Sequence, residues 1–270
     1  QDNLMSLHDQ VNARLRALFD GASDQRAALN EGLRLLGKWR SVLIANTLLE
    51  NNGTTVMQGP LKGLDFLSTS SEGCYVAKIL GCYEQPLQPF IEMAFARQYS
   101  TVINVGCAEG YYAVGMAKRM PHTEVHAFDL DVSAQSKCAE LAEKNSVQDR
   151  VVVGGEFHPS DFAHYTSQSV LLMCDIEGAE LELLDPLKSP ALRKMDLIVE
   201  SHECLRAGIT AELIERFDST HHVSLVGDDG QRTLEEVPEW FMNLAHLDQL
   251  LATWEWRSGP TPWLVMTCRA

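Results

Sequence analysis

The feature that most constrains this chain is a turn of small residues directly after an apolar segment. Residues 101–105 predict a buried β-strand, and residues 124–128 predict a second one. Small residues occupy the turn after the first strand, namely Gly106, Ala108 and Gly110. The second strand ends at Asp129, whose carboxylate is placed to accept hydrogen bonds from the two hydroxyls of a ribose. Together these elements predict a nucleotide-binding half-fold.

The spacing of the glycines in the turn separates two cofactor classes. A dinucleotide fingerprint has glycine at the first, third and sixth positions, but Tyr111 occupies the sixth position counted from Gly106. The glycines stand instead at the first and fifth positions, with Ala108 at the third. This arrangement resembles the G-x-G-x-G turn of class I S-adenosylmethionine-dependent methyltransferases.

The resemblance implies that S-adenosylmethionine is the cofactor and that residues near the turn bind it. These residues are Asn104, Gly106, Cys107, Ala108, Gly110, Asp129 and Leu130. Ala108 replaces the middle glycine of the family, and Asn104 stands where many members carry an acidic residue. After the third predicted strand, Glu156 is placed to accept a hydrogen bond from the adenine amino group, and Phe157 to pack on the ring. Asp175, after the fourth strand, is expected where the methionine end of the cofactor meets the acceptor.

A second motif lies at the end of the fourth predicted strand. Residues 171–180 end in an Asp-x-Glu-Gly-x-Glu run, and together with residues 196–202 they resemble the FkbM-type methyltransferases, which act on small metabolites. The resemblance covers roughly residues 55–205, with a looser match around residues 255–257. It implies an α/β fold with a Rossmann-like class I methyltransferase sheet, mostly parallel, in which the last strand is antiparallel.

The chain from residue 101 onward alternates between strand and helix patterns. The predicted strands are 101–105, 124–128, 150–154, 170–174, 196–200, 222–226 and 262–267. The predicted helices are 110–120, 132–145, 178–185, 209–217 and 239–253, preceded by another at 86–98. Residues 1–53 carry leucines at helical spacing and predict a helical extension. This extension either caps the site or forms a dimer interface, or it simply packs on the main domain. Residues 54–270 are assigned to the Rossmann-like domain, opening with two short strands within residues 54–68.

Polar side chains concentrate at the carboxyl ends of the predicted strands, where an open α/β sheet binds its ligands. His202 is the candidate general base, because an ordinary histidine pKa suits proton transfer near neutrality. The other catalytic candidates are Glu200, Asp175 and Glu203. The candidate acceptor-binding residues are Tyr83, Glu84, Glu177, Glu180, Glu200 and His202. Glu177 and Glu180 have an alternative, structural role at the N-terminus of the short helix that follows. The carboxylates follow no closed ligand pattern, so no metal site is predicted.

Composition narrows the classes of partner and compartment. The formal net charge is −15 and no cluster of Lys and Arg appears, which argues against a nucleic-acid partner. Seven scattered cysteines without a C-x-x-C pair suit a reducing compartment. No apolar run is long enough to span a membrane, and no signal-peptide pattern is visible. We therefore expect a cytoplasmic protein with a small-molecule substrate and no membrane partner, with a homodimer through the N-terminal helices as one option.

The combined patterns predict a methyltransferase that acts on a small polar metabolite, with natural-product biosynthesis as one setting. The FkbM-type resemblance favours a hydroxyl acceptor, whereas the carboxylates at the strand ends favour a cationic nitrogen, an amine or guanidinium. The charge argument gives a slight preference for nitrogen. An NAD-dependent oxidoreductase and a non-catalytic cofactor-binding protein are the alternatives from other classes.

Overall fold

The computed structural model describes residues 6–70, 73–97, 99–166 and 169–269. The chain forms two compact units. A helical unit contains Gln1–Gly53 and Glu236–Trp254, and an α/β unit contains Thr54–Glu235 and Glu255–Ala270. Residues 236–254, which sequence patterns assigned to the Rossmann-like domain, therefore group with the N-terminal helices.

A seven-stranded sheet forms the centre of the α/β unit. Its strands are β1 (Thr101–Val105), β2 (Glu124–Phe128), β3 (Val151–Gly154), β4 (Val170–Cys174), β5 (Asp196–Glu200), β6 (His221–Val226) and β7 (Trp263–Cys268). They lie in the order β3-β2-β1-β4-β5-β7-β6, and β7 runs antiparallel to β5 and β6 while the other pairs are parallel. The predicted Rossmann-like sheet, mostly parallel with an antiparallel last strand, is confirmed.

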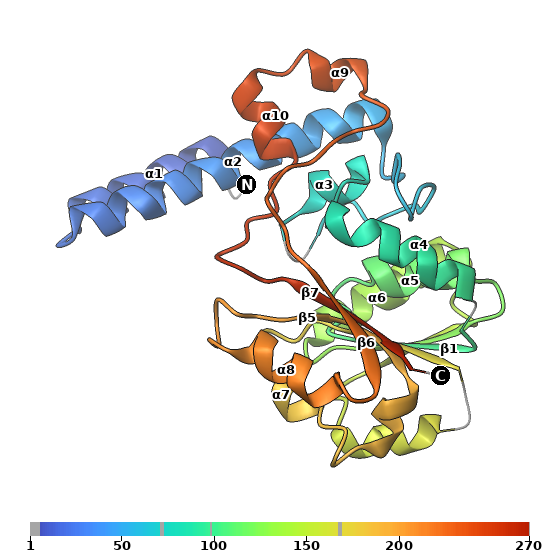
Figure 1. The fold of residues 1–270 in the computed structure, drawn as a ribbon. Coiled ribbons are helices and arrows are strands. Elements are labelled where there is room, and N and C mark those ends of the chain that lie inside the picture. The colour runs from blue at the N-terminus through green and yellow to red at the C-terminus, as the bar shows by residue number, and fades with distance from the viewer. Residues whose placement is uncertain (1–5, 71–72, 98, 167–168, 270) are drawn as a thin grey trace. The chain divides into compact units, whose positions relative to one another are not determined.

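Helices cover both faces of this sheet. The α-helices of the α/β unit are α3 (Tyr75–Leu80), α4 (Gln88–Arg97), α5 (Tyr111–Arg119), α6 (Val132–Lys144), α7 (Glu180–Leu183) and α8 (Ile209–Phe217). Short 3-10 helices are η1 (Gln85–Leu87), η2 (Pro159–Tyr165) and η3 (Pro190–Lys194). Figure 1 shows α5 and α6 on one face and α7 and α8 on the other. Strands β1 and β4 are consequently buried along their whole length, as expected for parallel strands covered on both sides.

The order of the strands determines where a ligand can bind. From β1 the chain continues into α5 on one face, and from the adjacent β4 it continues into α7 on the opposite face. The loops after these two neighbouring strands therefore diverge and leave a crevice at their carboxyl ends. Gly106 and Asp175 are the residues that directly follow β1 and β4.

The helical unit consists of α1 (Leu7–Asp20), α2 (Gln25–Asn52), α9 (Glu239–Met242) and α10 (His246–Ala252). Asp24 begins α2 by accepting hydrogen bonds from the backbone N–H groups of Arg26 and Ala27. The Arg40 guanidinium on α2 forms a two-bond ion pair with Asp248 on α10, at 2.6 Å for each bond. The α2 leucines at positions 29, 33 and 36 are exposed. A cap or dimer role for this unit stays a prediction.

Three segments differ from their sequence-based predictions. Residues 54–68 form turns with a single antiparallel bridge, between Thr55 and Asp65, because Gly59 and Gly63 adopt positive φ angles. Helix α3 was not predicted, since all six of its residues are buried and no amphipathic period marks it. The predicted helix at 239–253 is divided into α9 and α10. None of the helices in the described ranges is both long enough and apolar enough to cross a membrane.

Candidate active site

A cavity of about 470 Å³ lies at the carboxyl ends of β1, β2, β3 and β4. We call it the strand-end cavity. Predicted cofactor-binding residues from all four strand ends line it, namely Gly106, Asp129, Leu130, Glu156, Phe157 and Asp175. The crevice expected from the strand order is therefore the place where these residues come together.

Backbone contacts shape the floor of the strand-end cavity. A Cβ atom on Gly106 would lie 1.6 Å from the backbone oxygen of Asp175, and the φ of Gly106 is +78°, so only glycine fits. Ala108 adopts a left-handed φ of +47°, and its N–H donates to Asp129 Oδ2 at 2.8 Å. The N–H of Asp131 donates to Asp129 Oδ1 at 2.9 Å. Two backbone donors thus hold the Asp129 carboxylate at the wall of the cavity.

The residues predicted to face adenine lie in the same cavity in different environments. Phe157 is buried and packs against Phe128 and Phe162, with ring centroids 4.8 and 4.9 Å apart. The Glu156 carboxylate is exposed and lies 3.7 Å from His158 Nδ1. Leu130 is also exposed. These side chains provide an apolar wall and a polar rim.

A small cradle continues from the glycine turn into the interior, lined by Lys78, Asn104, Cys107, Ala108, Asp175 and Trp263 among others. We call it the inner cradle. Asn104 and Trp263 are both 3% exposed. Among the described residues, Asn104 Oδ1 and Trp263 Nε1 have no hydrogen-bond partner. A buried acceptor and a buried donor left without partners are costly in a ligand-free protein, and these two both line the inner cradle.

Gly110, also predicted to bind the cofactor, has a packing reason to be glycine. Its φ is +89°, and a Cβ atom there would lie 2.7 Å from Cys138 Sγ. Gly110 therefore allows the start of α5 to lie against α6. It lines neither the strand-end cavity nor the inner cradle.

A second cavity, of about 220 Å³, shares Asp175 and Glu177 with the strand-end cavity. We call it the acidic cavity. Its charged lining consists of Glu84, Asp175, Glu177, Glu200, His202, Glu255 and Arg257, and Tyr83 also lines it. Because the two cavities share residues, molecules bound in each would meet beside Asp175.

His202 occupies the centre of the acidic cavity. Its Nδ1 lies 2.7 Å from Glu180 Oε1, and Glu180 is fully buried. Its Nε2 lies 3.4 Å from Glu177 Oε2, 3.5 Å from Asp175 Oδ1 and 3.7 Å from Glu200 Oε2. Glu180 also accepts a hydrogen bond from the backbone N–H of Gly178. The Glu180 carboxylate therefore orients the imidazole so that Nε2 faces the cavity.

The charges around His202 determine the direction of its pKa. Burial lowers the pKa, but the hydrogen bond to Glu180 and the negative charges of Glu200, Glu180 and Glu177 raise it by more. The pKa of His202 consequently lies above its ordinary value. The surrounding carboxylates thus stabilise the protonated imidazole that forms when His202 accepts a proton.

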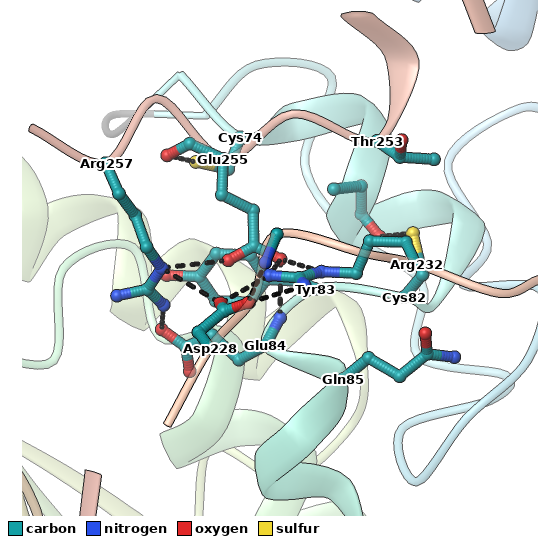
Figure 2. A network of polar contacts seen from close by, with 12 residues as sticks. Cys74, Cys82, Tyr83, Glu84, Gln85, Asp228, Arg232, Thr253, Glu255 and Arg257 are labelled. Carbon is teal, nitrogen blue, oxygen red and sulfur yellow. Dashed lines mark hydrogen bonds and ion pairs between the residues drawn. The ribbon is translucent and has the colours of Figure 1, made fainter. Parts of the chain in front are cut away.

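A network of carboxylates and guanidinium groups forms one wall of the acidic cavity (Figure 2). Arg232 forms a two-bond ion pair with Asp228, at 2.8 and 2.6 Å, and its Nε donates to Glu255 Oε1 at 2.6 Å. Arg257 pairs with Glu84 Oε1 at 3.1 Å, with Glu255 Oε2 at 3.3 Å and, through Nη1, with Glu200 Oε1. Both guanidinium groups are thus engaged by several carboxylates.

Glu84 is the carboxyl whose ionisation this network changes most clearly. Burial and the negative charge of Glu200 raise its pKa to about 8, although Arg257 opposes the shift. Glu255 adds a further negative charge, while the Tyr112 hydroxyl, at 2.5 Å from Glu84 Oε2, favours the ionised form. At neutral pH, Glu84 therefore holds a proton.

Strained backbone is concentrated at these cavities. Five described non-glycine residues have positive φ angles, and four of them line the cavities: Glu84, Ala108, Glu177 and Trp256. Such conformations cost of order 1–3 kcal/mol each and cluster at functional sites. Their distribution independently marks the cavities as the functional part of the α/β unit.

The structure gathers most of the predicted site residues but not Glu203. The Glu203 carboxylate accepts hydrogen bonds from the backbone N–H groups of Gly208 and Thr210, and it lines neither cavity. Sequence patterns did not identify Arg257, Trp263 or Lys78 as site residues. Lys78 forms a buried ion pair with Glu109 at 2.8 Å beside the inner cradle. These residues lie outside the glycine turn and strand-end motifs. Only Arg257 had a signal, the looser family match around residues 255–257, and that match assigned it no role.

No model of a known protein family matches the chain. Among solved structures, it is similar to the O-methyltransferase TomG from Streptomyces achromogenes, involved in tomaymycin synthesis, in complex with SAM. The identity is 11% over 86% of this chain and 90% of that chain, with a TM-score of 0.45. It is also similar to an rRNA methylase from Streptococcus thermophilus, at 13% identity over 68% of this chain and 96% of that chain, with a TM-score of 0.45. A third similar structure is that of the precorrin-6y C5,15-methyltransferase from Geobacter metallireducens. The identity is 8% over 67% of this chain and 89% of that chain, with a TM-score of 0.44.

Proposed function

We propose that this protein is an S-adenosylmethionine-dependent methyltransferase that transfers a methyl group to a small polar molecule. The observation that carries the proposal is the continuity of the strand-end cavity with the acidic cavity through Asp175 and Glu177. One cavity has the small-residue turn and terminal carboxylate of a nucleoside site, and the other contains an oriented histidine. The junction is the position at which a methyl donor and an acceptor must meet.

The residues present fit the cofactor. Asp129 would hold the ribose hydroxyls, and Phe157, Leu130 and Glu156 would border the adenine. In the inner cradle, Asn104 Oδ1 would accept from the ammonium group of the methionine end, and Trp263 Nε1 would donate to its carboxylate. This assignment supplies partners for both buried atoms that lack them. Asn104 can thus serve where many relatives carry an acidic residue, because the amide oxygen is also an acceptor.

The reaction requires alignment and the removal of one proton. When bound, the cofactor would supply an electrophilic methyl group to the acceptor atom, and the carbon–sulfur electron pair would stay on sulfur. His202 Nε2 takes the proton that the acceptor atom loses. Glu180 is the positioning residue, since its contact with Nδ1 at 2.7 Å leaves Nε2 toward the cavity. Asp175, Glu177 and Glu200 surround this nitrogen and bind the acceptor.

The acceptor atom in this proposal is a nitrogen, with the hydroxyl of an FkbM-like O-methyltransferase as the alternative. The excess of carboxylates in the acidic cavity supports nitrogen. The net charge of −15 supports a small metabolite, as in natural-product biosynthesis, over a nucleic acid. An NAD-dependent oxidoreductase is disfavoured by Tyr111, which is buried at the sixth position of the turn.

Calorimetry with S-adenosylhomocysteine and with NAD tests this proposal. We expect saturable micromolar binding of S-adenosylhomocysteine and no saturable binding of NAD, because the turn lacks the third glycine of a dinucleotide site. An Asp129→Ala variant should weaken the binding by about tenfold or more, the value of a charge-assisted hydrogen bond. Asp131→Asn, which removes a neighbouring negative charge and leaves an oxygen to cap α6, is the matched control. Binding of NAD alone would contradict the proposal. Binding without methyl transfer to any acceptor in a labelled screen would favour a non-catalytic protein.

A further inference from the structure

The acidic cavity contains more negative than positive side chains. Its lining includes the carboxyl groups of Glu84, Asp175, Glu177, Glu200 and Glu255. Among the described residues that line it, the basic side chains are Arg257 and His202. Most of these carboxyl groups are buried, and a buried anion is costly unless a cation or a proton accompanies it.

The guanidinium groups of the wall do not balance the carboxylates there. Arg232 and Arg257 face Glu84, Asp228, Glu200 and Glu255, so two cations face four carboxyl groups. The charge of Arg232 is neutralised by its ion pairs with Asp228 and Glu255, as Figure 2 shows. The excess of carboxylates also contributes to the raised pKa of Glu84, because a proton retained on Glu84 removes one negative charge from the wall.

Arg257 shows that this wall accepts a nitrogen cation. Its guanidinium group bridges Glu84 and Glu200. Because Arg257 belongs to the chain, it occupies the wall and leaves the cavity itself to another cation.

The open side of the cavity presents a second set of acceptors around one point. One ligand atom each of Asp175, Glu200 and His202 lies within 4.8 Å of the others. The Glu177 carboxylate is 80% exposed and lies 3.4 Å from His202 Nε2. His202 is 4% exposed, and no described residue hydrogen-bonds to its Nε2, since its one hydrogen bond is made through Nδ1. The three carboxylates around Nε2 are hydrogen-bond acceptors, so this side of the cavity suits a ligand that carries N–H donors.

We propose that the acidic cavity binds the acceptor as a small organic nitrogen cation, an ammonium or a guanidinium, held by Asp175, Glu177 and Glu200. This inference rests on the proposed function, because it identifies the substrate class of the same site. An alkylammonium offers three N–H donors, and a monosubstituted guanidinium offers five in one plane. Either group can donate to several of these carboxylates at the same time. A neutral hydroxyl compound would leave the excess of negative charge uncompensated.

The test uses two pairs of probes that differ in charge and little in shape. Methylammonium is compared with methanol, and methylguanidinium with N-methylurea, by ligand-observed NMR on the full chain at constant ionic strength. We expect at least one cation to bind saturably and about tenfold more tightly than its neutral counterpart, since a hydrogen bond to a charged group is worth that ratio. The pair that shows the larger ratio distinguishes an amine acceptor from a guanidine acceptor.

Variants locate the binding. Glu177→Gln should weaken binding of the preferred cation by about threefold to tenfold. Because the Glu177 side chain is exposed, this substitution should not unfold the protein, so weaker binding would report the lost charge. Glu143→Gln, an exposed carboxyl on α6, is the matched control and should stay within about twofold. Equal binding of cations and neutral counterparts by the wild type, or equal binding by Glu177→Gln and the wild type, would overturn the inference.

Two further outcomes separate this inference from the proposed function. If S-adenosylhomocysteine binds and no cation is preferred, the substrate class is wrong and the methyltransferase proposal stands. If the cations bind and S-adenosylhomocysteine does not, the cation site stands and the proposed function fails. Binding of Mn²⁺ that excludes both cations would assign the cluster to a divalent metal and overturn the inference.

Discussion

The strand-end cavity and the acidic cavity are adjacent but are built by different physical means. The strand-end cavity is shaped by backbone: a glycine that no side chain could replace, a left-handed alanine and a carboxylate held by two N–H groups. The acidic cavity is shaped by charged side chains that come from residues as far apart in sequence as Glu84 and Arg257. A backbone cavity suits a ligand of constant shape, whereas ion pairs can be varied without changing the fold. Under the proposed function, the cavity shaped by backbone would hold the cofactor and the cavity shaped by ion pairs would select the acceptor.

Among the predictions that test this difference between the two cavities, we expect the largest effect at Gly106, in the floor of the strand-end cavity. Gly106→Ala places a Cβ atom 1.6 Å from the Asp175 backbone oxygen, so β1 and β4 must move apart. Gly63→Ala is the matched control, because its φ is +84° and no atom lies within 4 Å of its added Cβ. We expect urea unfolding to show a loss of about 1–2 kcal/mol for Gly63→Ala, the cost of a left-handed conformation, and of about 4 kcal/mol or more for Gly106→Ala. Equal losses would show that the close approach at the cavity floor is unimportant.

Asn104 separates ligand binding from stability within the inner cradle. Asn104→Leu keeps the branching and the number of heavy atoms of the side chain, and it removes an amide whose oxygen has no described partner. The free energy of unfolding should therefore stay the same or rise, while the affinity for S-adenosylhomocysteine falls by about tenfold to a hundredfold. Urea unfolding and calorimetry measure the two effects, and Asn46→Leu on the exposed face of α2 is the control. A loss of stability without a loss of affinity would contradict the assignment of Asn104 to the ligand.

Glu84 gives the smallest expected effect and concerns the acidic cavity alone. Its pKa of about 8 lies above the ordinary value of 4.5. The folded protein therefore binds this proton more tightly than the unfolded chain, and the stability it contributes is lost as pH rises through about 8. We expect the Tm of the wild type to fall by a few degrees between pH 6 and pH 9 relative to Glu84→Gln, which cannot ionise.

The control for this pH dependence is Glu143→Gln, whose curve should run parallel to that of the wild type. If Glu84→Gln and the wild type lose the same number of degrees, Glu84 is ionised throughout the range. The wall would then hold its negative charge without a proton, and the comparison between the two cavities would rest on geometry alone.

Most of the fold could be predicted because its strands are marked locally. All seven strands begin and end within one residue of their predicted bounds. The patterns failed where burial has no period, as in α3, and where turns interrupt an apolar stretch, as in residues 54–68. Glu203 shows the same limit in the site, because its neighbour His202 enters the acidic cavity while Glu203 itself accepts backbone hydrogen bonds.

By itself, the sequence determined the sheet, the glycine turn and the carboxylate at Asp129, since each follows from burial and backbone conformation over a few adjacent residues. Only the tertiary structure decided which of 37 acidic and 22 basic residues meet in the acidic cavity. Ion pairing depends on the distance between two charged groups and on their burial. The spacing of residues along the sequence determines neither of them. The partners of Arg257, and with them the charge left over for an acceptor, are therefore properties of the folded chain.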